Sequence, residues 1–288
     1  MLTAEERSYI LENAYVPEHC ISLITCVSGS EPFLVEDFFV CLKNKWIILI
    51  GYPLDDKFTT QRLETVVSNV RKKFNPDRIS LIAPELPPSF ASTCQESETD
   101  AYYTLEVRKP IIRSALKRNL KNARRHLRVK SSNHMQEAHG ELMREFIARA
   151  KPSERVEQLL FKMPEFVASA DKAFVLNAWD SKNNLCAFYV VDIEALSFSN
   201  YIIGCHSKKN YILGASDLLL FELIQLSLEY DKHYIHLGLG VNAGVRRFKE
   251  KWGGVPVRRY EMCERVLKRL SIFETFLSLP KLLSAGIK

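Results

Sequence analysis

The segment from Tyr201 to Gly254 limits the possible fold more than any other part of the sequence. It opens with YIIGCH (201–206), which is typical of a strand, and a polar turn follows at 207–210. The next helix, 214–229, has large apolar residues on nearly every side of a helical wheel, so it is expected to lie buried against a sheet. YIHLGLG (234–240) is predicted to be a second strand. Because a helix connects the two strands, they are expected to run parallel.

The rest of the chain predicts further alternation of helices and strands. Residues 242–254 are expected to form a short basic helix that ends at a glycine pair. The other predicted helices are 3–14, 58–74, 136–150, 153–170 and an amphipathic terminal helix at 264–286, which either docks on the body of the protein or contacts a membrane surface. The other predicted strands are 21–27, a hairpin within 37–52, 79–83, 102–107, a hairpin over 174–193, 198–206 and 255–263, with a loop at 84–100. This order predicts a mixed α/β (α+β) fold.

Residues 109–130 are strongly basic, with no acidic residue between Glu106 and Glu137. They are predicted to form one amphipathic helix whose apolar side carries leucine and isoleucine. The basic side is a candidate contact for phosphate groups of RNA, of a nucleotide-linked substrate or of anionic lipid. The alternative is a solvated face without a partner. The candidate contact residues are Lys117, Lys121, Arg124 and Arg128, together with Arg246 on the later basic helix.

Composition indicates the environment in which the chain works. The formal net charge of +6 favours an anionic partner. The seven cysteines include no CxxC pair, which argues against a zinc site or a disulfide framework and fits a reducing compartment. The N-terminal residues are polar and acidic, unlike a signal peptide, and no apolar run reaches the roughly 18 residues that a transmembrane helix needs. A cytoplasmic protein without a metal is therefore expected.

Two patterns in the second half resemble the GNAT superfamily of N-acyltransferases. The family turn Arg/Gln-x-x-Gly-x-Gly/Ala matches residues 211–216 at Gly214, whereas Tyr211 and Ser216 depart from it. A later family pattern is met by Asn242, Phe248 and the glycine pair, with Lys249 where a tyrosine usually stands. The Phe-Lys pair and the basic stretch 114–130 are similar to the Fem-type aminoacyltransferases and to the catalytic domain of lysyl-phosphatidylglycerol synthase.

This resemblance implies two tandem GNAT-like domains, each a mixed central sheet flanked by helices. The expected limits are 1–108 for a degenerate N-terminal domain, 109–130 for the basic connecting helix and 131–288 for the domain with the active site. It also implies an acyl donor, either acyl-CoA or aminoacyl-tRNA, that enters between strands 201–206 and 234–239 where they diverge. The residues expected to hold the donor are Gly204, Cys205, Leu213, Gly214, Ala215, Ser216, Asn242 and Phe248.

The chemistry expected in such a site is the attack of an amine on a thioester or ester carbonyl. Lys249 is the candidate for stabilising negative charge, and His206 is the candidate base because it ends a strand where it can reach an amine. Asp192, Glu194 and His236 are weaker candidates. The function predicted from the sequence is transfer of an acyl or aminoacyl group to an amine acceptor. The alternative is a non-catalytic protein on the same scaffold that binds RNA or anionic lipid.

Overall fold

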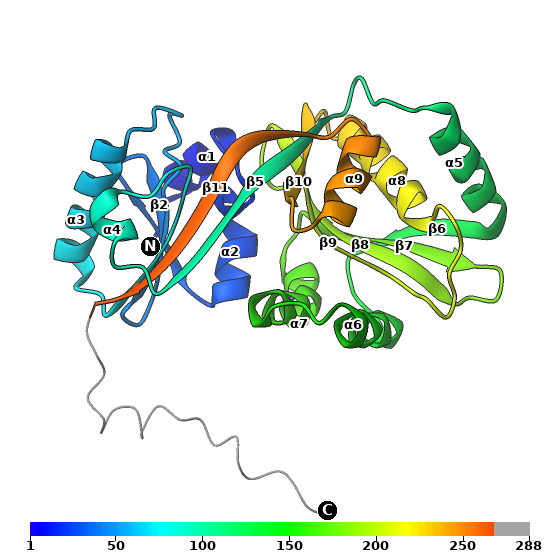
Figure 1. Cartoon of the computed structure of the whole chain (residues 1–288), viewed down its shortest axis with the longest axis horizontal. Coiled ribbons are helices and arrows are strands. Elements are labelled where there is room, and N and C mark those ends of the chain that lie inside the picture. The colour runs from blue at the N-terminus through cyan, green and yellow to red at the C-terminus, as the bar shows by residue number, and fades with distance from the viewer. Residues whose placement is uncertain (268–288) are drawn as a thin grey trace, which may run out of the picture.

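The computed structural model describes residues 1–267, and within them eleven strands form one continuous mixed sheet (Figure 1). The strand order is β1-β2-β3-β4-β11-β5-β10-β9-β8-β7-β6. Neighbours are antiparallel except for β3 with β4 and β9 with β10, which are parallel. The strands are β1 (Glu31–Val35), β2 (Phe38–Lys43), β3 (Trp46–Ile50), β4 (Arg78–Ala83), β5 (Glu96–Glu106), β6 (Leu127–Ser132), β7 (Ala173–Asp180), β8 (Leu185–Asp192), β9 (Phe198–His206), β10 (Tyr234–Leu239) and β11 (Val255–Val266).

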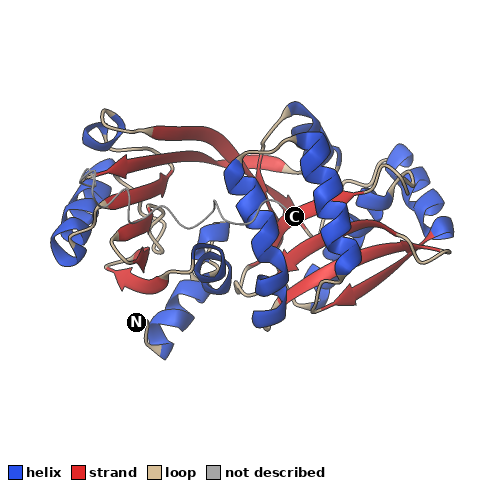
Figure 2. Cartoon of the chain, turned by 90° about the horizontal axis from the view of Figure 1, so that it is seen from below, coloured by secondary structure: helices blue, strands red, loops and turns tan. Residues whose placement is uncertain are grey.

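Helices cover both faces of this sheet in each of its two halves (Figure 2). In the half that holds β6 to β10, α5 and α8 cover one face while α6 and α7 cover the other. In the half that holds β1 to β4, α3 packs on one face, and α1 and α2 lie on the other. The helices are α1 (Ala4–Glu12), η1 (Pro17–His19), α2 (Ile21–Ser28), α3 (Thr60–Phe74), α4 (Pro88–Ala91), α5 (Ser114–His126), α6 (Glu137–Ala150), α7 (Glu154–Ser169), α8 (Ala215–Glu229) and α9 (Ala243–Lys251).

Strands β5 and β11 join the two halves. β11 pairs with β5 from Val255 to Glu264 and with β4 from Glu261 to Val266. The last described strand of the chain therefore completes the sheet of the first half. The mixed α+β fold predicted from the sequence is confirmed, whereas the tandem arrangement and its limits at 1–108, 109–130 and 131–288 stay predictions.

Helix α8 occupies the buried position that its sequence predicts. Leu219, Leu223 and Ile224 are almost inaccessible, and they pack in one core with residues of β5, β7, β8 and β10. Gly214 caps the helix at its N-terminus with a left-handed φ of 88°. The strand–helix–strand order around α8 places β9 and β10 side by side and parallel, as expected.

Three sequence predictions of local structure are wrong. Residues 21–27 form helix α2 rather than a strand, and part of the predicted loop 84–100 belongs to the long strand β5. The basic stretch 109–130 is not one helix, because α5 covers only 114–126 and Arg128 lies on β6. The predicted amphipathic side of α5 is confirmed, since Leu116, Leu120 and Ala123 are buried.

Two further predictions concern the C-terminal residues and the cysteines. The predicted terminal helix 264–286 begins inside β11, and its remainder, with the predicted membrane contact, lies outside the described residues. Cys94 and Cys263 form a disulfide, which the sequence analysis did not expect, and they link the start of β5 to β11. Within residues 1–267, no helix has the length and apolar content needed to cross a membrane.

Candidate functional site

Strands β9 and β10 separate after only three paired positions. The pairing runs from Tyr234 with Phe198 to His236 with Asn200, after which the two strands diverge. Each strand has an irregularity at this point: β10 shifts its register against β5 between His236 and Leu239, and β9 shifts against β8 by one extra residue near Ile202. Such bulges bend a strand and increase its twist. The divergence predicted from the sequence is confirmed.

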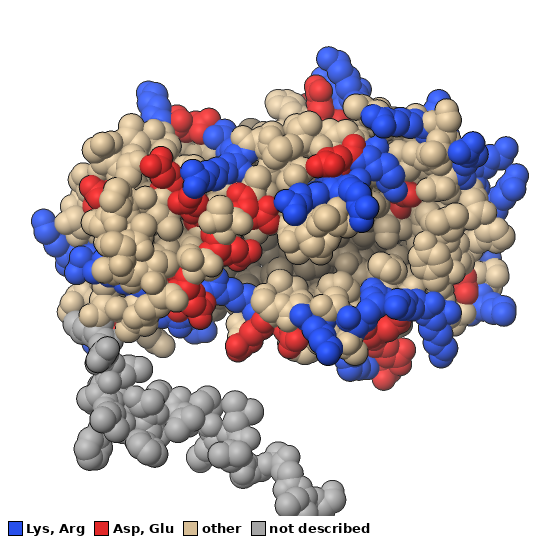
Figure 3. Space-filling model, in the orientation of Figure 1, with Lys and Arg blue, Asp and Glu red and all other residues tan. Residues whose placement is uncertain are grey.

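A cavity of about 280 Å³ opens where the strands diverge. β9 and β10 form its walls, α8 and α9 close two sides, and α6 contributes Phe146. Figure 3 shows this face hollowed between α9 above and α6 and α7 below, with lysine and arginine side chains on both rims. We call the cavity between β9 and β10 the wedge cavity. It is lined by Phe146, Tyr189, Tyr201, Gly204, Cys205, His206, Ser216, Leu220, Leu237, Gly244, Val245, Phe248 and Lys249.

Lys249 places a buried ammonium group in the wedge cavity. Its side chain comes from α9, the residue is only 3% exposed, and Nζ donates a hydrogen bond to the carbonyl oxygen of Leu239. The ring of Tyr103 lies 5.4 Å from Nζ. Burial lowers the pKa of Lys249 to about 8, against which the carboxylate of Asp100 acts in the opposite direction. The group thus stays largely charged at neutral pH, and an ammonium has three N–H donors, of which Leu239 uses one.

His206 stands at the far end of β9, where the wedge cavity meets a second cavity of about 260 Å³. Burial of its ring and the guanidinium of Arg149 lower the pKa of His206 below its ordinary value. Arg149 also donates to the carbonyl oxygen of His206. A neutral imidazole at neutral pH can accept a proton, which is the property that a general base needs.

The second cavity lies over the N-terminus of α8. It includes Leu213, Gly214, Ala215 and Ser216, and it shares His206, Ser216 and Phe248 with the wedge cavity. The first turn of a helix presents N–H groups and a positive dipole end, which suit a phosphate or an oxyanion.

Helix α5 packs closely against the backbone of Gly214. A Cβ on Gly214 would stand 2.7 Å from the carbonyl oxygen of Asn119 and 3.3 Å from Cβ of Ala123, both on α5. Asn122 of α5 donates to the carbonyl oxygen of Leu213 at 3.3 Å. Gly214 is one of the residues expected from the sequence to hold the donor, but the backbone of α5 occupies the space beside it.

Three residues of the site were not found from the sequence: Asp217 and Tyr189, which are buried, and Tyr201, which is partly buried. Asp217, in the first turn of α8, accepts hydrogen bonds from Trp252 at 3.1 Å and from Asn119 at 3.3 Å, and it forms an ion pair with Lys251. Tyr189 donates from its hydroxyl to the carbonyl oxygen of Ser216 at 2.9 Å, and its ring lies edge-on to that of Tyr201. An acidic residue opening an otherwise apolar helix was the one available signal for Asp217.

Other predicted residues lie outside both cavities. Asn242 caps α9, where its side-chain oxygen accepts from the N–H groups of Gly244 and Val245. His236 is buried on the opposite side of β10 from the core residues Ile235 and Leu237, and burial lowers its pKa to about 3. Asp192, the last residue of β8, and Glu194, two residues beyond it, line neither cavity.

The basic residues predicted to contact phosphates are all exposed. Those on α5 and β6 are Lys117, Lys121, Arg124 and Arg128, and Arg246 is on α9. Arg124 also stacks over Phe221 of α8, with its guanidinium carbon 4.6 Å from the ring centre. Exposure agrees with a phosphate contact and equally with a solvated face, so the role of these residues stays a prediction.

No protein-family model matches the sequence, and no curated protein matches it either. The fold, however, is similar to that of several solved structures. The C-terminal DUF2156 domain of a protein described as a lysylphosphatidylglycerol synthetase, from Agrobacterium fabrum, superposes with a TM-score of 0.60 at 13% identity, over 90% of this chain and 92% of that one.

Two more structures show the same likeness. L-PGS from Bacillus licheniformis has a TM-score of 0.57 at 13% identity, covering 96% of this chain and 95% of that chain. FemX has a TM-score of 0.61 at 9% identity, covering 91% and 96%. At this level of identity the comparison establishes a fold, and that fold is the one found in tandem-GNAT, Fem and lysylphosphatidylglycerol synthetase structures.

Proposed function

We propose that this protein transfers an acyl or aminoacyl group from an activated donor to an amine in the wedge cavity. The observation that carries the proposal is the early end of pairing between β9 and β10, which opens a cavity with a buried, largely protonated Lys249 inside it. A cavity of this size accepts an activated carboxyl group together with an amine. The names of the similar structures, lysylphosphatidylglycerol synthetase among them, support transfer of an acyl group in the same fold.

The reaction has three steps that the site residues can serve. The neutral amine attacks the carbonyl carbon of the thioester or ester, and a tetrahedral oxyanion forms. The intermediate then collapses, the carbon–sulfur or carbon–oxygen bond to the donor breaks, and an amide bond remains. The proton lost from the attacking nitrogen passes to the leaving group, directly or through a base.

Lys249 stabilises negative charge in this scheme, on the oxyanion or on the leaving group. Its ammonium is already desolvated, so an added anion gains more from it than from a solvated lysine. His206 receives the proton of the amine, because a lowered pKa keeps its ring neutral at the pH where it must act. The first turn of α8, reached through Ser216, supplies further positive potential beside the donor.

The donor is acyl-CoA or an aminoacyl-tRNA, and the acceptor is a small or nucleotide-linked amine. Fold likeness to FemX and to lysylphosphatidylglycerol synthetase favours aminoacyl-tRNA, and the exposed basic residues of α5 offer contacts for its phosphates. We further infer that the two halves of the sheet are tandem GNAT-like domains and that the first is degenerate.

A second function is supported by a different observation. The backbone of α5 stands against Gly214, so the space that a bound pyrophosphate would need beside this residue is partly taken. Together with Tyr211 in place of the family Arg/Gln, this favours a scaffold that binds RNA or anionic lipid through its basic residues without catalysis.

The deciding experiment combines ligand identification with turnover. Native mass spectrometry of the purified protein and thermal shift with coenzyme A, acetyl-CoA and aminoacyl-tRNA identify the donor, and a labelled donor then reports transfer to a panel of amines. Lys249→Ala and His206→Ala are expected to reduce transfer strongly while the fold is kept. Arg247→Ala is the matched control, since this exposed residue of α9 lines neither cavity. No stabilisation by any donor, together with salt-sensitive RNA or liposome binding, supports the non-catalytic function instead.

A further inference from the structure

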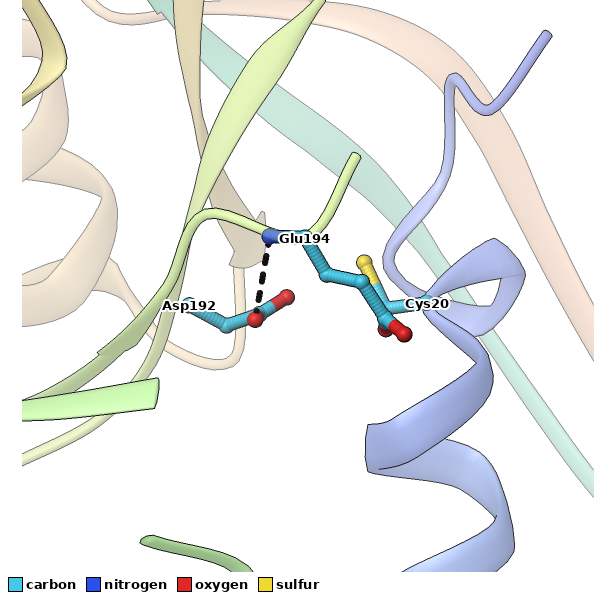
Figure 4. Close-up of side chains that lie close together, drawn as sticks. All are labelled: Cys20, Asp192 and Glu194. Carbon is cyan, nitrogen blue, oxygen red and sulfur yellow. Dashed lines mark hydrogen bonds between the residues drawn. The ribbon is translucent and has the colours of Figure 1, made fainter. Parts of the chain in front are cut away.

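Three potential metal ligands converge in the protein interior, away from the wedge cavity (Figure 4). Cys20 precedes the first turn of α2, Asp192 ends β8, and Glu194 follows two residues later. The thiol sulfur and one oxygen of each carboxyl group all lie within 4.8 Å of one another. The close-up shows the three side chains pointing toward a common space between α2 and the end of β8.

The carboxyl group of Asp192 lacks a partner for one of its oxygens. Asp192 is 1% exposed, and Oδ1 accepts from the N–H of Glu194 at 3.1 Å, but no hydrogen bond of normal geometry reaches Oδ2 from any residue of 1–267. Burial and the Glu194 carboxylate raise the pKa of Asp192, and a side-chain hydrogen bond from the Cys20 thiol to this carboxyl group acts in the opposite direction. The side-chain amide nitrogen of Asn200, the cross-strand neighbour of Asp192, is likewise buried without a partner among the described residues. A buried oxygen of this kind is costly unless something else occupies the space beside it.

The neighbouring charged side chains do not donate a hydrogen bond to Oδ2 of Asp192. Glu194 accepts from the N–H and the hydroxyl of Ser22 at 3.1 and 2.7 Å, which satisfies one of its oxygens. The ammonium of Lys232 is near enough to act on Asp192, yet it donates to the carbonyl oxygens of Ala195 and Leu196. Burial raises the pKa of all three potential ligands, of Asp192 to about 7.

We propose that Cys20, Asp192 and Glu194 bind one divalent transition-metal ion, with Zn²⁺ as the best fit. A thiolate favours the softer first-row ions over Mg²⁺ and Ca²⁺, and Zn²⁺ accepts sulfur and carboxylate oxygen together in a tetrahedral set. The unpartnered Oδ2 of Asp192 becomes a ligand atom, and a water or a second carboxylate oxygen completes the coordination. Binding releases the thiol proton of Cys20.

The ion would act as a structural link and not as part of the reaction site. Asp192 pairs with Asn200, six residues before His206 on β9, which separates the metal ligands from His206 by roughly 20 Å along the strand at about 3.3 Å per residue, and none of the three ligands lines the wedge cavity. It would join the N-terminal helices to the sheet of the second half. The scattered cysteines, with no CxxC pair, predict no zinc site, whereas here the three potential ligands come from distant parts of the sequence. The proposal is independent of the transferase function.

Metal analysis of the full-length protein provides the first test. Elemental analysis after purification without added chelator is expected to give one zinc per chain. The protein freed of metal is then titrated with Co²⁺, whose bond to a thiolate gives a charge-transfer band in the near ultraviolet. Zinc or cobalt is also expected to raise the melting temperature of the metal-free protein.

Variants identify the ligands. Cys20→Ser is expected to abolish the charge-transfer band. Asp192→Asn and Glu194→Gln are expected to weaken Zn²⁺ binding by at least about 100-fold, because loss of a direct ligand costs more than the roughly 10–100-fold of an outer-shell substitution. Cys41→Ser is the matched control, because Cys41 is equally buried and its thiol interacts with Ser30 rather than with acidic groups. If Cys20→Ser does not fold, the Co²⁺ titrations of the natural protein and of Glu194→Gln still test the proposal. Absence of metal after purification and of any cobalt–thiolate band, or a band that survives in Cys20→Ser, overturns the proposal.

Discussion

The carboxylate of Asp217 accepts a hydrogen bond from the indole N–H of Trp252 at 3.1 Å, and both side chains are buried. The same carboxylate holds Lys251 of α9 and Asn119 of α5. One residue thus fixes α5, α8 and α9 together beside the two cavities. Its place in the first turn of α8 also suits its charge, because the N-terminus of a helix favours an anion.

Replacing Asp217 by alanine is expected to lower the free energy of unfolding by about 2–4 kcal/mol. The change leaves the buried indole N–H without an acceptor and removes the partner of a half-exposed ammonium. Urea unfolding followed by tryptophan fluorescence measures the loss. The matched control is Glu222→Gln on the same helix, whose partly exposed pairing with Arg124 at 3.9 Å is worth less than about 1 kcal/mol. Equal losses in both variants would contradict the role given to Asp217.

The pH dependence of transfer is expected to follow the charge of Lys249. If its ammonium stabilises the reaction, kcat/KM falls as the pH rises through about 8, where the lowered pKa removes the charge. Lys249→Arg keeps a positive charge throughout this range, so its falling limb should disappear even if its rate is lower. Rates measured from about pH 6 to about pH 10 test this, with amine acceptors of different pKa used to separate the titration of the substrate from that of the enzyme.

The same buried charge is expected to cost stability. Lys249 titrates near 10.5 when unfolded and near 8 when folded, so the folded protein binds fewer protons between these values. Its stability therefore decreases as the pH falls from about 10.5 to about 8, and the penalty remains constant below. At pH 7, Lys249→Met should raise the unfolding free energy by at most about 3 kcal/mol, because it removes the buried charge. Loss of the hydrogen bond to Leu239 reduces this gain by about 1 kcal/mol. The matched control is Arg247→Met, at an exposed residue of the same helix. If Lys249→Met is less stable than the natural protein while this control is unchanged, the contacts of the buried ammonium outweigh the cost of burying it, and the prediction is wrong.

The sequence predicted the parts of this site that local pattern determines. The all-round apolar character of α8 identified a buried crossover helix, and that helix made β9 and β10 parallel neighbours. Residues 21–27 were misassigned because isoleucine, threonine and valine favour strands locally, whereas α2 is fixed by packing of Leu23, Cys26 and Val27 against the core beneath α7. The contacts of Asp217, the pair Tyr189 and Tyr201, and the reach of β11 to β4 depend on residues distant in sequence, for which a single sequence holds no signal.

Charge reversal on α5 is expected to distinguish the two donors. If aminoacyl-tRNA is the donor, Lys117→Glu with Lys121→Glu should weaken tRNA binding and reduce the slope of log K against log salt by about 1 for each phosphate that is no longer bound. If acyl-CoA is the donor, the double variant should transfer as the natural protein does. Lys72→Glu with Lys73→Glu, at two exposed positions in the last turn of α3, is the control for net charge, because it makes the same change in the other half of the sheet. Equal weakening by both pairs would mean that only the overall charge matters.

The disulfide between Cys94 and Cys263 is expected to make stability depend on reductant. It ties the start of β5 to β11 across 169 residues of sequence, so its loss frees a long loop in the unfolded chain. The chain-entropy argument sets the resulting loss of unfolding free energy at about 2–5 kcal/mol. Thiol titration in denaturant should find five reactive cysteines in the oxidised protein and seven after reduction, the five being those at positions 20, 26, 41, 186 and 205. In urea unfolding, reductant should destabilise the natural protein but leave Cys94→Ser unchanged; the same response in both would mean that the bond is not formed in solution.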